Sequence, residues 1–201
     1  MDELIESLKK NNILKTPRII KAFRNTDRIH FVKKENRKYA YSDRPLSIGR
    51  GQTISQPLTV AFMLEELQPE KGNEVLDIGS GSGWTTALLS RLVGEEGSVI
   101  GLEIKHKLVE FGQENLNKLD IENAKIEQAR ENVLGIPDKK FDKILVSAAA
   151  KREPEELLDQ LKEGGTLVIP IGGSIYKIDK TPNGETVREE YPGFAFVPLI
   201  H

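Results

Sequence analysis

The chain has 201 residues, a formal net charge of −2, and 30% charged against 38% hydrophobic residues. This length suits one sizeable α/β domain, and the balanced charge gives no sign of a surface built to bind polyanions. Without cysteine, the chain has no disulfide framework, thiolate nucleophile or cysteine-ligated metal. Its three histidines are scattered, so we expect no metal site; they are His30, His106 and His201.

The N-terminal part predicts two amphipathic helices. The first covers Asp2 to Asn11 and places Leu4, Ile5 and Leu8 on one face. Thr16 before Pro17 is typical of a helix N-cap followed by proline at the first helical position. There is no apolar core of signal-peptide length and no run of about 18 apolar residues, so we expect a cytoplasmic protein without a membrane partner.

The next segment, residues 28–51, has no helical period and many turn-forming residues. It still contains apolar residues, among them Tyr39, Tyr41 and Ile48. A loop of this length in a compact domain is usually functional or disordered. Because of its apolar content, we expect an ordered segment that covers part of the domain.

A helix is predicted to begin at Pro57, where an apolar stripe starts and continues to Leu67. Thr53 and Ser55 precede this helix and are candidate caps. From its spacing alone, Ser55 is either a helix cap or a residue of a functional site.

The stretch Glu74 to Gly83, EVLDIGSGSG, predicts a buried strand, a glycine loop and the start of a helix. Asp77 lies close to the end of the strand. Three glycines then alternate with two serines; they are Gly79, Ser80, Gly81, Ser82 and Gly83. A loop with so few Cβ atoms allows a ligand to lie directly on the backbone, beside the amides of the following helix.

The glycine spacing differs from that of a dinucleotide site, which has glycine at its first, third and sixth positions. Counted from Gly79, the sixth position is Trp84. The pattern instead resembles the first motif of S-adenosylmethionine-dependent methyltransferases, in which Asp77 would help to hold the cofactor's ammonium group. An acidic residue about 20 positions later is expected to bind ribose hydroxyls, and Glu103 is placed to do so.

The order of elements predicts an α/β fold with a doubly wound, mostly parallel sheet of Rossmann-like type. Strands are expected at Glu74–Gly79, Ser98–Glu103, Ala124–Gln128, Lys143–Ser147 and Thr166–Pro170, with helices at Trp84–Val93, Lys105–Leu119 and Glu153–Leu161. We expect one domain with three parts: N-terminal helices and covering segment (1–57), cofactor-binding core (58–172) and C-terminal β extension (173–201). In the extension, a hairpin turning at Asn183-Gly184 and the FVPL segment should lengthen one sheet edge.

Several runs resemble the protein-L-isoaspartate (D-aspartate) O-methyltransferase family, in order along nearly the whole chain. They are DRPLSIGRGQTISQP, VLDIGSGSGW, FDKILVSAAA, EPEELLDQLKEGGTLVIPIGG and GFAFVPLI. Many methyltransferases share the glycine motif, whereas GQTISQP and the FVPL ending are much more particular to this family.

The resemblance implies the site residues. Ser55 would be the residue associated with catalysis, and S-adenosyl-L-methionine would be the cofactor. The cofactor-binding residues would be Gln52, Thr53, Ile54, Ser55, Asp77, Gly79, Ser80, Gly81, Gly83 and Glu103. The family usually has Gly-Asp-Gly after its third strand; here the matching residues are Arg130, Glu131 and Asn132, and Glu131 or Asn132 would accept a hydrogen bond from the adenine amine.

The implied activity is methyl transfer to the free α-carboxylate of L-isoaspartyl residues in damaged peptides and proteins, which begins their repair. Such a carboxylate, with a pKa of about 3.3–3.7, is already an anion at pH 7 and needs no strong base. We expect a monomer without a nucleic-acid partner. The alternatives are a methyltransferase for another acceptor, such as RNA or a small molecule, and an inactive cofactor-binding homologue.

Overall fold

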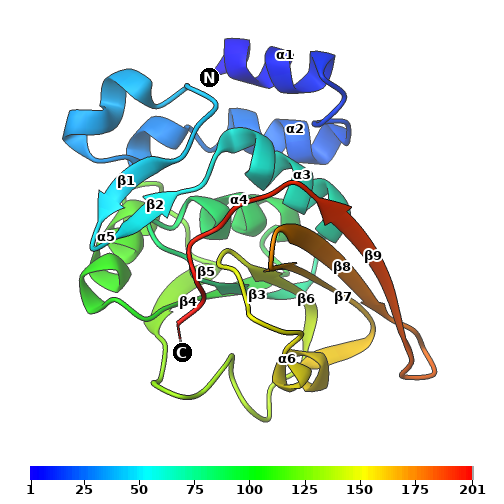
Figure 1. Ribbon diagram of the computed structural model, residues 1–201. Helices are drawn as coiled ribbons and strands as arrows, with labels where there is room; N and C mark the ends of the chain where they lie inside the picture. Colours follow the sequence, from blue (N-terminus) through cyan, green and yellow to red (C-terminus); the bar gives the residue numbers. More distant parts are fainter. Residues whose placement is uncertain (201) are drawn as a thin grey trace.

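A seven-stranded sheet with the order β5-β4-β3-β6-β7-β8-β9 forms the centre of the protein in the computed structural model, which describes residues 1–200 (Figure 1). The strands from β5 to β7 pair in parallel, and β8 and β9 join antiparallel at one edge. The predicted doubly wound sheet is therefore confirmed. The strands are β3 Glu74–Ile78, β4 Ser98–Glu103, β5 Ala124–Gln128, β6 Phe141–Val146, β7 Leu161–Ile171, β8 Ser174–Lys180 and β9 Thr186–Pro192.

Helices cover the sheet, and a small hairpin of β1 and β2 lies beyond it. The helices are α1 Asp2–Lys10, α2 Pro17–Arg24, α3 Pro57–Leu67, α4 Trp84–Val93, α5 His106–Asn117 and α6 Glu155–Asp159, and the hairpin strands are β1 Leu46–Gly49 and β2 Gln52–Ile54. Within residues 1–200, no helix combines the length and the apolar character needed to cross a membrane. His201 lies outside the described residues.

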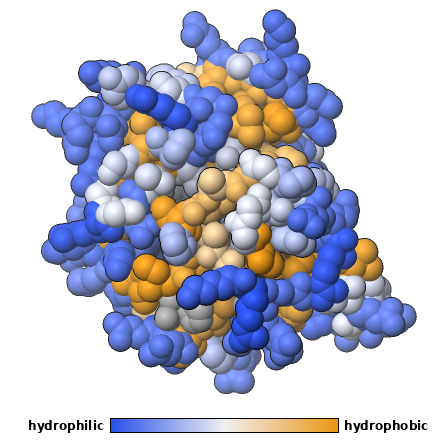
Figure 2. All heavy atoms as spheres, viewed as in Figure 1, coloured by the Kyte–Doolittle hydropathy of each residue, from blue (hydrophilic) through white to orange (hydrophobic). Residues whose placement is uncertain are grey.

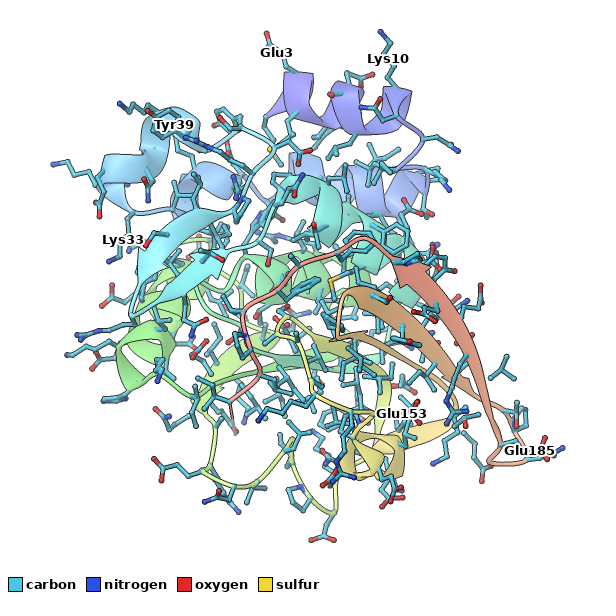
Figure 3. The ribbon with its side chains drawn as sticks, in the orientation of Figure 1. Glu3, Lys10, Lys33, Tyr39, Glu153 and Glu185 are labelled. Atoms are coloured by element: carbon cyan, nitrogen blue, oxygen red, sulfur yellow. The ribbon has the colours of Figure 1, made fainter. Side chains whose placement is uncertain are left out.

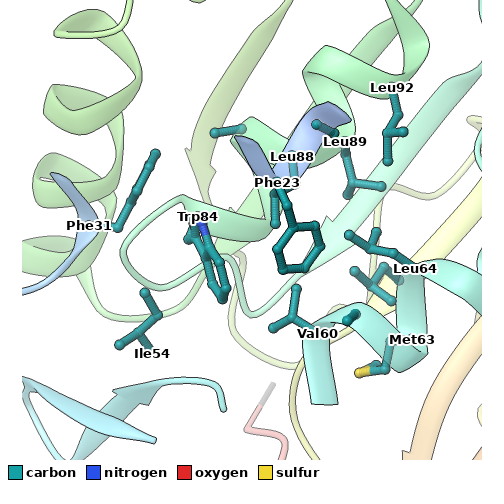
Figure 4. Packing of buried hydrophobic residues seen from close by; sticks show 14 of the residues in the cluster. Phe23, Phe31, Ile54, Val60, Met63, Leu64, Trp84, Leu88, Leu89 and Leu92 are labelled. Atoms are coloured by element: carbon teal, nitrogen blue, oxygen red, sulfur yellow. The ribbon is translucent and has the colours of Figure 1, made fainter. Parts of the chain in front are cut away.

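Strand β3 is buried on both faces, which explains its nearly unbroken apolar run. Val75 packs into the cluster on the α4 side, and Leu76 packs into the cluster on the other side; both are fully buried. On the α4 side, the rings of Phe23 and Trp84 meet edge to face with centroids 5.6 Å apart (Figure 4). Helix α2 is thereby fixed onto the start of α4.

The residues 28–51 are more regular than we expected. They contain two 3₁₀ helices, η1 Arg28–Phe31 and η2 Lys34–Tyr39, and strand β1.

The side chain of Thr16 does not cap α2, because its hydroxyl donates instead to Glu65 Oε2 at 2.6 Å.

The predicted helix Glu153–Leu161 is wrong in its extent. Helix α6 ends at Asp159, and Leu161 already pairs with Phe141 in the sheet. The strand predicted to begin at Thr166 therefore begins at Leu161, with an irregularity in register opposite Phe141 and Lys143. Pairing and burial of Leu161 outweigh the local helical pattern.

The C-terminal FVPL segment corrects another prediction. The hairpin of β8 and β9 lengthens the sheet edge as expected, and the amide of Gly184 donates to the carbonyl of Thr181 at 2.9 Å in its turn. The following residues leave the edge and cross the carboxyl ends of the strands (Figure 1). There Ala149 N–H donates to the Val197 carbonyl, and Leu199 N–H donates to the Ala149 carbonyl, both at 2.8 Å.

A prediction concerns Gly112 of α5, which packs directly against the glycine loop. A Cβ atom there would lie 2.6 Å from Ile126 Cδ1 and 2.9 Å from the Gly81 carbonyl oxygen. Although alanine is the better helix former, we expect Gly112→Ala to lower the free energy of unfolding by about 1–3 kcal/mol through overpacking.

Denaturant unfolding measures this change. The control is Gly173→Ala, because a Cβ atom at Gly173 meets nothing within 4 Å. If Gly112→Ala were as stable as the control variant, the close packing of α5 on the loop would be contradicted.

Candidate functional site

A cleft lies at the carboxyl ends of β3, β4 and β6, where the glycine loop, strand β2 and the C-terminal segment meet. Open α/β sheets usually bind ligands at this place. Its lining residues are Gln52, Thr53, Ile54, Ser55, Val60, Ile78, Gly79, Ser80, Gly81, Ser82, Trp84, Thr85, Leu102, Glu103, Ile104, Ala129, Ser147, Ala148, Val197, Pro198, Leu199 and Ile200. We call it the cofactor cleft.

The glycine loop has a backbone that requires glycine. Gly79, Gly81 and Gly83 have φ values of 81°, 53° and 84°, a region that residues with a Cβ rarely adopt. The amides of Gly79 and Ser80 both donate to the Leu102 carbonyl, at 2.8 and 3.1 Å. Gly79 and Gly81 line the cleft, whereas Gly83 does not, because it packs against Gly112.

Glu103 ends β4 with a carboxylate that is almost fully buried. One oxygen accepts from the amide of Gly81 at 3.0 Å, and the other accepts from the amide of Lys105 at 2.8 Å. Each oxygen keeps acceptor capacity for a ligand hydroxyl. Of the described residues that line the cleft, Glu103 alone carries a charge.

Asp77 lies beneath the cleft surface and does not line it. Its Oδ2 accepts from the hydroxyls of Thr85 at 3.0 Å and Thr86 at 2.6 Å, while the buried Oδ1 has no partner within residues 1–200. Burial raises the pKa of Asp77 to about 6; the hydrogen bonds from Thr86 and Thr85 oppose this rise, and the nearby charge of Glu103 adds to it. Asp77 thus supports the start of α4 through its Oδ2 atom, and its expected part in holding the cofactor stays a prediction.

These residues fit S-adenosylmethionine. Two buried carboxylates stand at the strand ends without a basic side chain in the cleft lining, so a cationic ligand is favoured electrostatically and a pyrophosphate is not. The hydroxyls of Ser80 and Ser82 are buried without a partner in the described chain and are available to a polar ligand. Glu103, which lines the cleft and keeps acceptor capacity, would accept hydrogen bonds from the ribose hydroxyls of the cofactor.

Ser55 lies where a second cleft joins the first. This acceptor cleft is lined by Pro45, Thr53, Ser55, Gln56, Thr59, Ser147, Ala195, Phe196 and Val197. The two clefts share Thr53, Ser55, Ser147 and Val197. No side chain of the acceptor cleft carries a charge.

Neither Thr53 nor Ser55 caps α3, so that alternative is wrong. The N-cap is Gln56, and the amide of Leu58 donates to Asp43 Oδ1 at 2.8 Å. Within residues 1–200, no hydrogen bond involves the Ser55 hydroxyl. It is therefore free to contact a ligand from either cleft.

Arg28 is an important residue that sequence reasoning missed. Its fully buried guanidinium donates to the carbonyls of Ala40 at 2.7 Å, Arg44 at 3.1 Å and Ser55 at 2.9 Å. It also lies 5.2 Å from the ring centre of Trp84, and burial lowers its pKa to about 10. Arg28 thus joins the covering segment to the backbone at Ser55, which only tertiary structure could reveal.

Two predicted cofactor residues are not brought to the cleft. Glu131 and Asn132 are exposed, and Asn132 lines a separate depression beside Lys139 and Gln160. Ala129 is the residue of this segment that lines the cofactor cleft. Sequence reasoning also missed Ser147 and the C-terminal residues from Val197 to Ile200, because it placed the C-terminal segment at the sheet edge.

A prediction follows from the burial of Asp77. Its pKa rises from 3.8 to about 6 on folding, so the folded state binds the proton more tightly. Ionisation of Asp77 therefore lowers the free energy of unfolding as the pH rises from about 4 to 6. Above pH 6 the free energy of unfolding is lower by about 3 kcal/mol than it would be with an unshifted pKa. We expect Asp77→Asn to raise the free energy of unfolding of the ligand-free protein at pH 8, with a gain that shrinks toward pH 4.

Denaturant unfolding at several pH values measures this gain. The control is Asp120→Asn, which changes a carboxyl outside both clefts. A gain for Asp77→Asn that did not change with pH would show that the buried charge is not its source.

Comparison with known proteins identifies the family. The family model described as Protein-L-isoaspartate(D-aspartate) O-methyltransferase (PCMT) matches residues 1–201. Protein-L-isoaspartate O-methyltransferase from Ignicoccus hospitalis is 42% identical, with 98% of this chain and 96% of that protein covered. The corresponding enzyme from Methanopyrus kandleri is 40% identical, with 99% and 90% covered.

Solved structures agree with these relatives. A crystal structure of a PCMT from Plasmodium falciparum in complex with S-adenosyl-L-homocysteine has a TM-score of 0.86 and 31% identity, covering 98% of this chain and 96% of that one. A structure of a protein-L-isoaspartate O-methyltransferase has a TM-score of 0.88 and 31% identity, covering 98% of this chain and 65% of that one. The chain belongs to the protein-L-isoaspartate (D-aspartate) O-methyltransferase family and shares its fold, its enzyme class and its S-adenosylmethionine cofactor.

Proposed function

We propose that the protein methylates the free α-carboxylate of L-isoaspartyl residues in damaged peptides and proteins, with the two clefts holding the two reactants. The observation that carries this proposal is the position of Ser55. It lines both a cleft with buried carboxylates, suited to a cationic cofactor, and an uncharged cleft that can receive a peptide.

In the cofactor cleft, Glu103 would accept hydrogen bonds from the ribose, and the loop Gly79–Ser82 would lie against the amino-acid part of the cofactor. Asp77 would stabilise the cofactor's positive charge from beneath the loop. Bound S-adenosylmethionine supplies an electrophilic methyl group on its sulfonium sulfur. We assign no adenine contact to Glu131 or Asn132.

In the acceptor cleft, the substrate carboxylate arrives already ionised, because its pKa is about 3.3–3.7. No general base is needed, and none of the lining residues is a histidine, lysine or carboxylate. The hydroxyl of Ser55 would donate a hydrogen bond to the carboxylate and orient one oxygen toward the methyl group. Correct alignment of the reactants can supply up to about 7–11 kcal/mol of the barrier reduction.

The rest of the chain supports the same assignment. Arg28 donates to the Ser55 carbonyl and so fixes the backbone that presents the hydroxyl. The segment Val197–Leu199 is tied to Ala149 and closes the cleft on the side of β6. Both clefts are formed by one chain, which supports action as a monomer. We propose that it acts in the cytoplasm, where the absence of cysteine suits a reducing compartment.

Methyl transfer from labelled S-adenosylmethionine tests the proposed function. Two short peptides of the same sequence, one with isoaspartate and one with aspartate, are the acceptors. We expect base-labile label on the isoaspartyl peptide alone. Transfer to RNA or a small molecule, with neither peptide labelled, would instead assign a different acceptor.

A prediction concerns the Ser55 hydroxyl. A hydrogen bond to a charged group contributes about 1.5–3 kcal/mol, so Ser55→Ala should lower kcat for an isoaspartyl peptide by about tenfold to a hundredfold. The affinity for S-adenosylhomocysteine, measured by calorimetry, should stay within about twofold, because Glu103 and the loop remain.

The control is Ser47→Ala, which removes a hydroxyl from strand β1, in the hairpin that precedes Ser55, at a position that lines neither cleft. Unchanged turnover in Ser55→Ala would exclude an orienting role for this hydroxyl.

A further inference from the structure

The covering segment, residues 28–51, differs in charge from the rest of the chain. It contains seven Lys and Arg residues against two Asp and Glu, a formal charge of +5, whereas the chain as a whole carries −2. The remaining residues therefore carry −7. Such a separation of charge produces a local positive potential that bulk composition conceals.

Most of these cations face solvent without a carboxylate partner. Five of them are exposed and form no ion pair among the described residues; they are Lys34, Arg37, Lys38, Arg44 and Arg50. Of the two acids in the segment, Asp43 accepts bonds from Leu58 N–H and Gln56 Nε2. Figure 2 shows hydrophilic residues gathered over this part of the molecule, at its upper left.

Tyr39 organises part of this surface. Its ring, 37% exposed, has Lys38 Nζ at 4.8 Å and the Arg44 guanidinium carbon at 4.3 Å from its centre. Cation–π contacts of this kind hold long basic side chains in place. Lys33 lies on the same segment near β1 (Figure 3), beside Gly49.

The surface leads directly to the acceptor cleft. Arg44 is followed by Pro45, which lines that cleft, and Arg50 lies in the turn just before Gln52 and Thr53. A peptide with its isoaspartyl residue beside Ser55 would have neighbouring residues within reach of these cations. The cleft itself has no charged lining side chain that could select among peptide sequences.

We propose that the covering segment recruits acidic peptides, so that isoaspartyl residues flanked by Asp or Glu are the preferred substrates. This specificity rests on the proposed function, because the recruited chain must deliver a carboxylate to the acceptor cleft. Complementary charge acts over several ångströms, raises the rate of encounter and lowers KM without changing the chemical step. Deamidation itself adds negative charge to the substrate chain.

A basic surface with exposed tyrosines also suits single-stranded nucleic acid. The acidic peptide is favoured because the surface borders a cleft suited to a carboxylate acceptor. In addition, the ring of Tyr39 has two of the segment's own cations against it, Lys38 and Arg44, which leaves less of the ring open for stacking with bases.

The test compares isoaspartyl peptides of one core sequence with flanking Glu, Gln or Lys residues. At low salt we expect the KM of the Glu peptide to be about tenfold below that of the Gln peptide, with equal kcat, and the Lys peptide to have the highest KM. The difference should largely disappear at about 1 M salt, where the Debye length is about 3 Å.

The variant Lys34→Glu/Arg37→Glu/Lys38→Glu should remove the preference for the Glu peptide and leave kcat for the Gln peptide unchanged. The matched control Lys10→Glu/Lys15→Glu/Lys71→Glu has the same change in net charge at exposed positions outside the segment. It should keep the preference.

Equal KM values for the three peptides, while all are methylated, would overturn the recruiting surface and leave the proposed function intact. No methylation of any isoaspartyl peptide would instead contradict the proposed function. Stronger inhibition by a single-stranded oligonucleotide than by an acidic peptide without isoaspartate would identify nucleic acid as the partner and overturn the proposal.

Discussion

Two buried carboxylates at the ends of neighbouring parallel strands are the constraint on which the site depends. In the β3–β4 register, Asp77 is opposite Gly101, and Glu103 lies two residues further along β4. Burying such groups without partners would be costly. Two threonine hydroxyls at the start of α4 satisfy one oxygen of Asp77, and backbone amides of the glycine loop and of Lys105 satisfy Glu103.

This arrangement explains the glycine loop. The chain must turn sharply enough for the Gly81 amide to reach Glu103 and for α4 to begin above Asp77. All three loop glycines accordingly have positive φ. Gly101 on β4 and Gly112 on α5 pack against the loop, and a Cβ atom at either position would crowd it. The loop, the strand ends and the helix start therefore form one unit, whose remaining negative charge favours a cationic cofactor.

The covering segment provides the other half of the site. Among the described residues, the buried Arg28 forms no ion pair, and its two terminal nitrogens donate to backbone carbonyls of the covering segment and of Ser55. Its contact with Trp84 joins this segment to the first residue of α4. The residues that hold the cofactor loop and those that position Ser55 thus meet around a single tryptophan.

The central fold could be predicted from the sequence because its signals are local. The apolar run before Gly79, the glycine spacing and Asn183-Gly184 each determine the conformation of a few neighbouring residues. The bounds of α6 and the course of the FVPL segment could not be predicted in the same way, since pairing with Phe141 and Ala149 decides them.

The candidate site shows the same division. Ser55, Glu103 and the loop were found from short motifs, although the capping of α3 by Asp43 was not. The glycine motif also singled out Asp77, but it did not indicate that this side chain is buried beneath the loop. Glu131 and Asn132 were assigned by matching a motif, and the structure places them outside the cleft because the chain turns outward after Ala129.

The most direct measurement is a crystal structure of the protein with S-adenosylhomocysteine and an isoaspartyl peptide. The account predicts the ribose on Glu103, and the peptide's free α-carboxylate within about 3 Å of the Ser55 hydroxyl and facing the sulfur from the acceptor cleft. A carboxylate bound elsewhere, or a peptide that reached the sulfur without passing Ser55, would contradict the assignment of the two clefts.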